Sequence, residues 1–342
     1  MPQNEITSSL SILNEKGQPQ NFGWAKNSLY FYDPALSYSP GYKFSESDRY
    51  IVFSPTHIVV FEVRDDGWSG QVGVSVVSLR DKKRSTQIFK SMLPLGSYEL
   101  PASSVSGSMR WNKKKSKLDF FCMESGARIL KADFPKFGRH RSLRGALVLS
   151  EFDDPHSLYT NQPWRGKKNA FRLSRCSPCF FAEGMIQLGS TEIIFKRGNA
   201  WGIFDWNRGV RPNADIRYLA AACGICGGKL LSICAGYSGA DFSQGTENGF
   251  FIDGKLYKLD QVTFHIPLSN WLAPWRFTSN DNKLEMTFVP HQERIERRRL
   301  FLFNITRRQV FGFFSGKINM EDGTVLEFHN LTGFAERNKT QF

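Results

Sequence analysis

The sequence lacks any long apolar run, and no stretch approaches the eighteen residues typical of a membrane-spanning helix. Its first twenty residues also lack the charged segment and apolar core of a secretory signal. Stretches rich in Ala, Leu, Glu and Lys with a 3.6-residue period are absent, which argues against long helices. From these absences we expect a soluble, cytoplasmic protein with little helix.

Recognisable catalytic and nucleotide-binding motifs are missing as well. Nothing resembles a Ser-His-Asp triad or a phosphate-cradling loop, and Gly224, Gly227 and Gly228 lack the strand–turn–helix context of a dinucleotide fingerprint. No helix-turn-helix, zinc finger or RNA-binding aromatic motif is present. We therefore expect no cofactor and no specific nucleic-acid partner.

Cysteine is scarce, with six residues in a chain of 342. Two pairs, Cys176/Cys179 and Cys223/Cys226, have the CxxC spacing found in zinc sites. The gap between the pairs is far longer than in a zinc ribbon, and residues three apart on a strand face opposite sides. We therefore predict no metal site and interpret the cysteines as reduced, mostly buried thiols.

Aromatic residues and turns are abundant, with 30 Phe, 8 Trp and 29 Gly. This composition is typical of a β-rich protein whose wide interior is filled by bulky side chains. Turn signals such as Asp65-Asp66-Gly67 and Asp253-Gly254 separate strand-like segments about every ten residues. The pattern predicts an all-β fold of antiparallel barrels or sandwiches.

A polar segment over residues 153–169, with three Pro or Gly residues, interrupts this pattern and is the candidate linker. We predict two β domains, residues 1–168 and residues 169–342. Residues 1–16 are polar and are interpreted as a loose arm, which precedes the aromatic run Tyr30-Phe31-Tyr32.

The net charge is +13 and the pI is about 9.5. Positive residues cluster between strand-like runs, so we interpret them as solvated hairpin tips that protect sheet edges. The alternative is a surface for nucleic acid or an anionic membrane, formed by Lys113 to Lys117 and Arg294 to Arg299. Weak contact with an anionic membrane stays open in this interpretation.

The segment from Trp201 to Pro212 combines two indoles, a carboxylate, an amide and two guanidiniums within a dozen residues. Buried charge is tolerated only when it is paired and hydrogen-bonded, so we expect Asp205 to meet Arg208 or Arg211. The segment is either the wall of a ligand pocket or a structural Asp–Arg staple, and the residues favour neither.

Several motifs occur in a fixed order in the second half of the chain, from Trp201 to Arg208 and from Gly236 to Asp241, then Thr246-Glu247-Asn248, Phe251 to Leu256, Pro274-Trp275, Phe288-Val289-Pro290, Phe311 to Gly316, and Leu331 to Glu336. In this combination the chain resembles an uncharacterised bacterial domain-of-unknown-function family. More remotely, it is similar to the AttH and carotenoid 1,2-hydratase group.

The resemblance implies two lipocalin-like β-barrel domains in tandem, with a ligand pocket in or between the barrels. In the hydratase branch, water adds to an isoprenoid double bond by acid catalysis without a cofactor, and fungal relatives are associated with pericyclic ring closures. The hydratases carry His where this chain has Trp206, and Trp where it has Arg208. Loss of the imidazole argues against carotenoid hydration here.

Three residues are candidate acids for such chemistry. Aromatic neighbours would raise the pKa of Asp205, whereas a paired Arg would keep it ionised and make it a poor acid. Asp241 lies in a Gly- and Ser-rich loop that could cap a pocket, and His265 lies on a strand. A lone strand His is more often a core residue than a catalyst.

Our leading hypothesis is the binding of an apolar or amphipathic small molecule, such as a lipid or isoprenoid, in an aromatic barrel pocket. Candidate ligand-binding residues are Trp201, Asp205, Trp206, Arg208, Arg211, Tyr237, Asp241, Glu247 and Trp275. A cofactor-independent lyase, hydratase or isomerase acting on such a ligand is the second hypothesis. A basic protein that docks on membranes or nucleic acid is the third.

Overall fold

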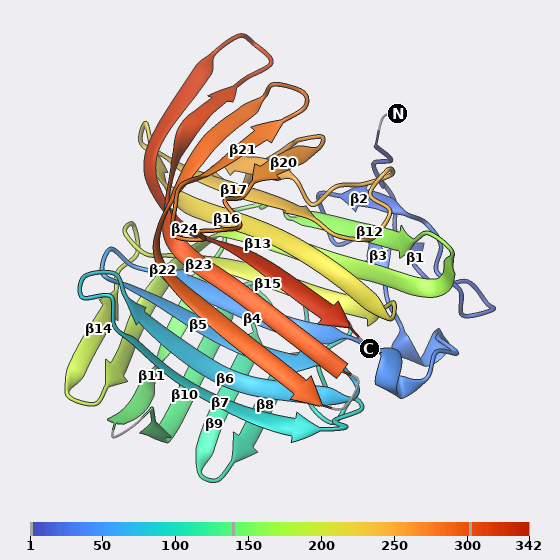
Figure 1. Ribbon diagram of the computed structural model, residues 1–342, viewed down its shortest axis with the longest axis horizontal. Coiled ribbons are helices and arrows are strands. Elements are labelled where there is room, and N and C mark those ends of the chain that lie inside the picture. Colours follow the sequence, from blue (N-terminus) through green and yellow to red (C-terminus); the bar gives the residue numbers. More distant parts are fainter. Residues whose placement is uncertain (1–2, 139–140, 301–302, 342) are drawn as a thin grey trace.

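The computed structural model describes residues 3–138, 141–300 and 303–341. Most of these residues form two large, twisted antiparallel sheets that curl into half-barrels (Figure 1), which confirms the all-β prediction. Among the helices of the described residues, none combines the length and apolarity needed to cross a bilayer.

Within the described residues, the first sheet contains 13 strands. They are β2 (Gly23–Ala25), β4 (Glu46–Phe53), β5 (His57–Asp65), β6 (Ser69–Ser78), β7 (Arg84–Met92), β8 (Ser108–Lys113), β9 (Ser116–Cys122), β10 (Arg128–Phe137), β11 (Arg141–Ser150), β12 (Leu158–Trp164), β13 (Lys167–Leu188), β14 (Thr191–Phe195) and β15 (Trp201–Val210). The main path runs β7-β6-β5-β4-β15-β13-β11-β10-β9-β8.

The second sheet has nine strands in the same described part of the chain, in the order β19-β18-β17-β16-β24-β23-β22-β21-β20. Their bounds are β16 (Ala214–Cys226), β17 (Lys229–Tyr237), β18 (Gly249–Ile252), β19 (Lys255–Lys258), β20 (Val262–His265), β21 (Trp275–Ser279), β22 (Leu284–Leu300), β23 (Phe303–Asn319) and β24 (Val325–Gln341).

Residues 3–16 pack against the first half-barrel, so the prediction of a loose arm is wrong for this described part of residues 1–16. The strands β1 (Leu10–Ser11) and β3 (Tyr30–Phe31) pair in parallel, and the short 3-10 helices η1 (Pro34–Leu36) and η2 (Gly41–Lys43) follow. The arm is held because Ile6, Ile12 and Leu13 are buried in the first core.

The strands β22, β23 and β24 each serve two cores. Their apolar halves, with Phe288 and Phe314 among others, are packed inside the second half-barrel. Register shifts at Pro290/Gln292 and Phe314/Gly316 mark irregularities in these strands. Figure 1 shows that the three strands bend and that their other halves, which end near the C-terminus, lie over the blue strands β4 to β6.

The predicted boundary between residues 168 and 169 does not coincide with the change of sheet. The strands β13, β14 and β15, which follow it, are hydrogen-bonded into the first sheet. The chain passes to the second sheet between Val210 and Ala214. The polar segment around residue 160 misled the prediction because part of it is itself strand β12, paired with β13.

The turns agree with their sequence signals. Asp253 and Gly254 have φ values of 47° and 80° between β18 and β19, as a tight hairpin requires. Lys113, Lys114 and Lys115 are exposed at the β8–β9 turn. Along β22, by contrast, Arg294 and Arg298 are buried and only the alternate Arg297 and Arg299 are exposed, so half of this cluster is not surface.

Candidate functional site

The strand β15 separates two environments because successive side chains of a strand point to opposite faces. Phe204 and Trp206 point into the core of the first half-barrel. Ile203 belongs to the apolar cluster between the two sheets, and Asp205 points the same way, towards the second sheet. Asp205 and Trp206, expected to share one pocket, therefore lie on opposite sides of the first sheet.

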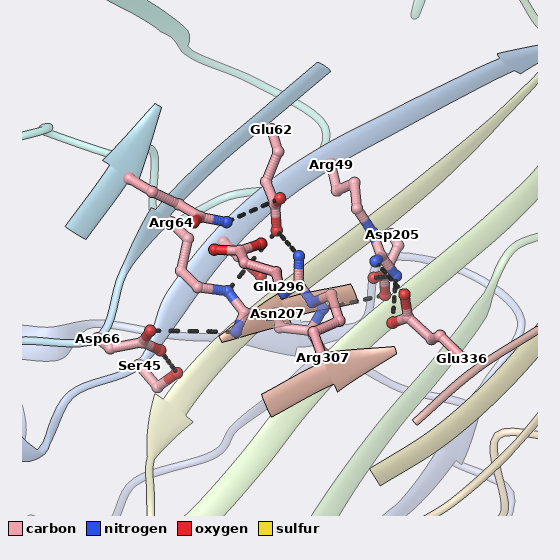
Figure 2. Close-up of polar contacts among 12 residues, drawn as sticks. Ser45, Arg49, Glu62, Arg64, Asp66, Asp205, Asn207, Glu296, Arg307 and Glu336 are labelled. Carbon is pink, nitrogen blue, oxygen red and sulfur yellow. Dashed lines mark hydrogen bonds and ion pairs between the residues drawn. The ribbon is translucent and has the colours of Figure 1, made fainter. Parts of the chain in front are cut away.

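Asp205 does not pair with Arg208 or Arg211, which corrects the sequence prediction. Its carboxylate accepts a hydrogen bond of 2.6 Å from Arg49 of β4 and lies 3.4 Å from Arg217 of β16. Arg49 also contacts Glu336 of β24 at 2.6 Å, as Figure 2 shows. The carboxylate therefore joins the two sheets and is 4% exposed.

This environment decides the protonation of Asp205. Burial would raise the pKa of its carboxyl, but the guanidiniums of Arg217 and Arg49 outweigh burial and hold the pKa at about 2. Asp205 is therefore ionised at neutral pH and is unsuited to donate a proton.

The ion pairs continue along the interface between the sheets (Figure 2). Glu62 of β5 pairs with Arg307 of β23. Arg298 of β22 donates to Ser69 of β6 at 2.7 Å and lies 3.7 Å from Asp66. All of these side chains are buried. We call this set, together with Arg49, Asp205 and Glu336, the inter-sheet charge layer.

A pocket with several aromatic side chains in its wall lies on the other side of β15, at the first half-barrel. It has a volume of about 340 Å³. Strands β12, β13 and β15 contribute Tyr159, Leu173 and Trp206, and the rest of the wall comes from residues 28–32 and 102–104, with Ser9 of the arm. We call it the aromatic cavity.

Two buried donors of the aromatic cavity have no hydrogen-bond partner among the described residues, namely the hydroxyl of Tyr30 and Nε1 of Trp206. Other polar groups there are satisfied: the hydroxyls of Ser104 and Tyr159 lie 3.1 Å apart. Burial raises the pKa of Tyr30, so its hydroxyl stays protonated and can donate. An unpartnered buried donor is costly, so each of these two groups would gain from a nearby acceptor.

One residue of the aromatic cavity is hydrogen-bonded to a carboxyl. Tyr32 lines the cavity, and its hydroxyl donates to Glu46 Oε1 at 3.3 Å. Burial raises the pKa of Glu46 above its ordinary value, although Arg208 opposes the rise. Glu46 is thus suited to carry a proton, and no local sequence pattern indicated this.

Arg208 and Arg211 support the fold around these sites. Arg208 is fully buried, pairs with Asp48 at 2.8 Å and lies over the Trp206 ring at 4.6 Å. Arg211 donates to the backbone carbonyls of Phe44, Tyr42 and Asp66. Neither side chain contacts Asp205.

The remaining predicted residues are dispersed. Trp201 packs against the inter-sheet apolar cluster, and Trp275 is fully buried in the second core. Tyr237 lines a separate hollow of about 210 Å³ at the second half-barrel. Glu247 is buried, where it accepts hydrogen bonds from Ser174 and Arg217.

Neither of the other two candidate acids lines the aromatic cavity. Asp241 binds Arg165 at 2.9 Å, and this hydrogen bond lowers its pKa to about 2. His265 is exposed on β20, with Nε2 3.1 Å from the Thr278 hydroxyl.

No group of three or more potential metal ligands was found among the described residues. Cys223 lies in the inter-sheet cluster and Cys226 packs against the second core, on opposite faces of β16. The side chain of Cys179 lies outside the described residues.

The chain matches the family described as Domain of unknown function (DUF2804) over residues 3–342. It belongs to this family. No curated protein matches the sequence.

Solved structures share the fold at low identity. CghA is 10% identical over 98% of this chain and 94% of its own, with a TM-score of 0.55. CghA with Sch210972 is 10% identical over 88% of this chain and 89% of its own, with a TM-score of 0.53. Kievitone hydratase from Nectria haematococca is 8% identical over 87% of this chain and 88% of its own, with a TM-score of 0.50. A putative AttH (NE1406) from Nitrosomonas europaea is 11% identical over 87% of this chain and 92% of its own, with a TM-score of 0.45. The family match confirms the resemblance to a domain-of-unknown-function family. The likeness to CghA and kievitone hydratase concerns the fold alone.

Proposed function

We propose that this protein binds an apolar or amphipathic small molecule in the aromatic cavity. The observation that carries the proposal is a space of about 340 Å³ with aromatic walls and two unpartnered donors, Tyr30 and Trp206. Pockets for small molecules commonly measure about 300–1,000 Å³, are mostly apolar and contain a few placed polar groups.

The two donors define the chemistry of the ligand. A carbonyl, ether or hydroxyl oxygen would satisfy the Tyr30 hydroxyl or Trp206 Nε1, while the rest of the ligand contacts the rings and Leu173. The structure of CghA with Sch210972 supports the proposal, since CghA shares this fold and was solved with Sch210972.

Binding is tested with Nile red, a neutral apolar probe, and by native mass spectrometry of the purified full chain. Ala102 lines the aromatic cavity, so Ala102→Trp should fill it and weaken saturable binding at least about tenfold. Ala273, in the loop before β21, has similar partial exposure and serves as the matched control in Ala273→Trp. Equal affinity in both variants, or no saturable binding to the unaltered chain, would refute the proposal.

A second candidate function is a cofactor-independent lyase or hydratase on the bound molecule, favoured by the Tyr32–Glu46 pair. In this scheme Glu46 is protonated and donates its hydrogen bond to the Tyr32 oxygen, which is the reverse of the bond to the ionised carboxylate and leaves the Tyr32 proton free to face the ligand. Glu46 then gives its proton to the Tyr32 oxygen as Tyr32 gives its own to the ligand, so no tyrosinate forms. Water then adds to the resulting cation, and its released proton restores Glu46. The raised pKa of Glu46 supports this role.

Mass spectrometry of the co-purified molecule before and after incubation would reveal addition or loss of water. Tyr32→Phe and Glu46→Gln should each abolish the conversion while leaving Nile red affinity unchanged. Conversion at the original rate in both variants would exclude this pair as the acid.

A further inference from the structure

A second, polar cavity of about 80 Å³ lies where the chain passes from the first sheet to the second. Its lining includes five guanidiniums and two carboxylates: Arg64, Arg172, Arg208, Arg211 and Arg217, with Asp66 and Asp215. We call it the arginine cavity. It is separate from the aromatic cavity, because β13 directs Arg172 here and the adjacent Leu173 to the other side.

Two of these arginines form only long ion pairs. Arg64 lies 3.8 Å from Glu62 and 4.0 Å from Asp66. Arg172 lies 3.6 Å from Asp215. Arg217, in contrast, contacts Glu247 at 2.9 Å. The Nε groups of both Arg64 and Arg172 lack a hydrogen-bond partner among the described residues.

Unpartnered polar atoms of both kinds gather around the same space. Trp164 Nε1 is a further donor without a partner in the described part of the chain. Two acceptors, Asn207 Oδ1 and Asn338 Oδ1, also lack a partner there. Asp66 Oδ2 has ion-pair neighbours but accepts no hydrogen bond from the described residues. A fitting ligand therefore needs acceptor oxygens and at least one O–H donor.

We propose that the arginine cavity binds hydrogen phosphate. Its oxygens would accept from Arg64, Arg172 and Trp164, and its hydroxyl would donate to Asp66 or an Asn amide oxygen. A carboxylate or sulfate has no such hydroxyl at neutral pH. The volume of about 80 Å³ is enough for a free phosphate.

Electrostatics support this assignment. Burial lowers the pKa of Arg172 and, with help from neighbouring Arg307, lowers that of Arg64 to about 10. Both guanidiniums therefore lie in surroundings that disfavour their charge, and a bound anion would offset part of that cost.

The test is calorimetric titration of the full chain with inorganic phosphate at constant ionic strength, set with sodium chloride. We expect one saturable site, with sulfate and acetate each at least about tenfold weaker. Arg172→Gln and Asn338→Leu should each weaken phosphate binding at least about tenfold. Arg276→Gln is the control, because Arg276 is exposed and pairs with Glu285 on the second half-barrel.

Asn338→Leu removes an amide without removing a charge, so it keeps the test valid if Arg172→Gln does not fold. Absence of saturable phosphate binding would overturn the proposal, as would unchanged affinity in Asn338→Leu or equal affinity for sulfate. Nile red binding measured on the same samples separates this outcome from failure of the aromatic-cavity proposal.

Discussion

Replacing Asp205 by Asn tests whether the carboxylate serves structure or catalysis. Asp205 joins Arg49 of the first sheet to Arg217 of the second, and all three side chains are largely buried. In Asp205→Asn, Arg49 keeps Glu336 and Arg217 keeps Glu247, so neither guanidinium loses every partner. Breaking a buried pair costs about 3–5 kcal/mol, and we expect the lower end of that range.

The pKa of Asp205 gives a second route to the magnitude. The difference between the ordinary value of 3.8 and about 2 corresponds to about 2 kcal/mol, at about 1.4 kcal/mol for each tenfold change. Because the folded-state pKa is the lower one, ionised Asp205 stabilises the fold at neutral pH. This contribution is lost as the pH falls from about 4 towards about 2.

Urea denaturation at pH 7 and pH 3 measures both effects. Asp205→Asn should lower the free energy of unfolding by about 2–3 kcal/mol at pH 7 and by less at pH 3. Asp154→Asn is the matched control, since it removes a carboxylate from an exposed pair with Lys255 and should leave the midpoint unchanged. An Asp205→Asn protein as stable as the original at pH 7, or a deficit independent of pH, would refute the structural role.

Three further predictions concern other parts of the chain. Burial raises the pKa of Glu46, so its ionised form is unfavourable in the fold; Glu46→Gln should raise the urea midpoint at pH 8, with a gain that shrinks towards pH 4. An equal gain at both pH values would contradict this. Trp275→Ala should lower the free energy of unfolding by about 3–5 kcal/mol, because Trp275 is fully buried in the second core. Nile red affinity should stay unchanged in the folded fraction. Weaker binding in that fraction would place a ligand in the second half-barrel. Neutralising the exposed Lys113, Lys114 and Lys115 together should shorten retention on heparin without changing the melting temperature, and unchanged retention would show that this hairpin tip contributes little to the basic surface.

Local signals predicted local structure well. Asp-Gly pairs mark hairpins because their backbone conformations are intrinsic to the residues, and Asp253-Gly254 behaves as expected. The partner of Asp205 was not predictable in this way, since Arg49 lies 156 positions away and is brought close only by pairing of β4 with β15. Strand geometry alone, however, opposes a pair between Asp205 and Arg208, which are three positions apart and face opposite sides.

The same geometry explains what was missed in the aromatic cavity. Tyr30 and Tyr32 were visible as an aromatic run, but nothing local indicated that this segment would cover Tyr159 and Trp206. The burial of Arg294, Glu296 and Arg298 could have been predicted from their spacing. Alternate positions of one strand share a face, and a face that carries both signs of charge can be buried through ion pairs.

The inter-sheet charge layer contributes more to the arrangement of the sheets than to their adhesion. Buried ion pairs are weak stabilisers compared with apolar residues of similar volume, and the apolar contacts around Phe311 and Phe334 already hold the sheets together. The polar pairs follow strand order: β4 meets β24 through Arg49–Glu336, β5 meets β23 through Glu62–Arg307, and β6 meets β22 through Ser69–Arg298. Three ordered contacts specify both the offset and the angle between two sheets, which apolar packing alone would leave adjustable. The positions of Arg64, Arg172 and Asn338 around the arginine cavity therefore depend on this layer.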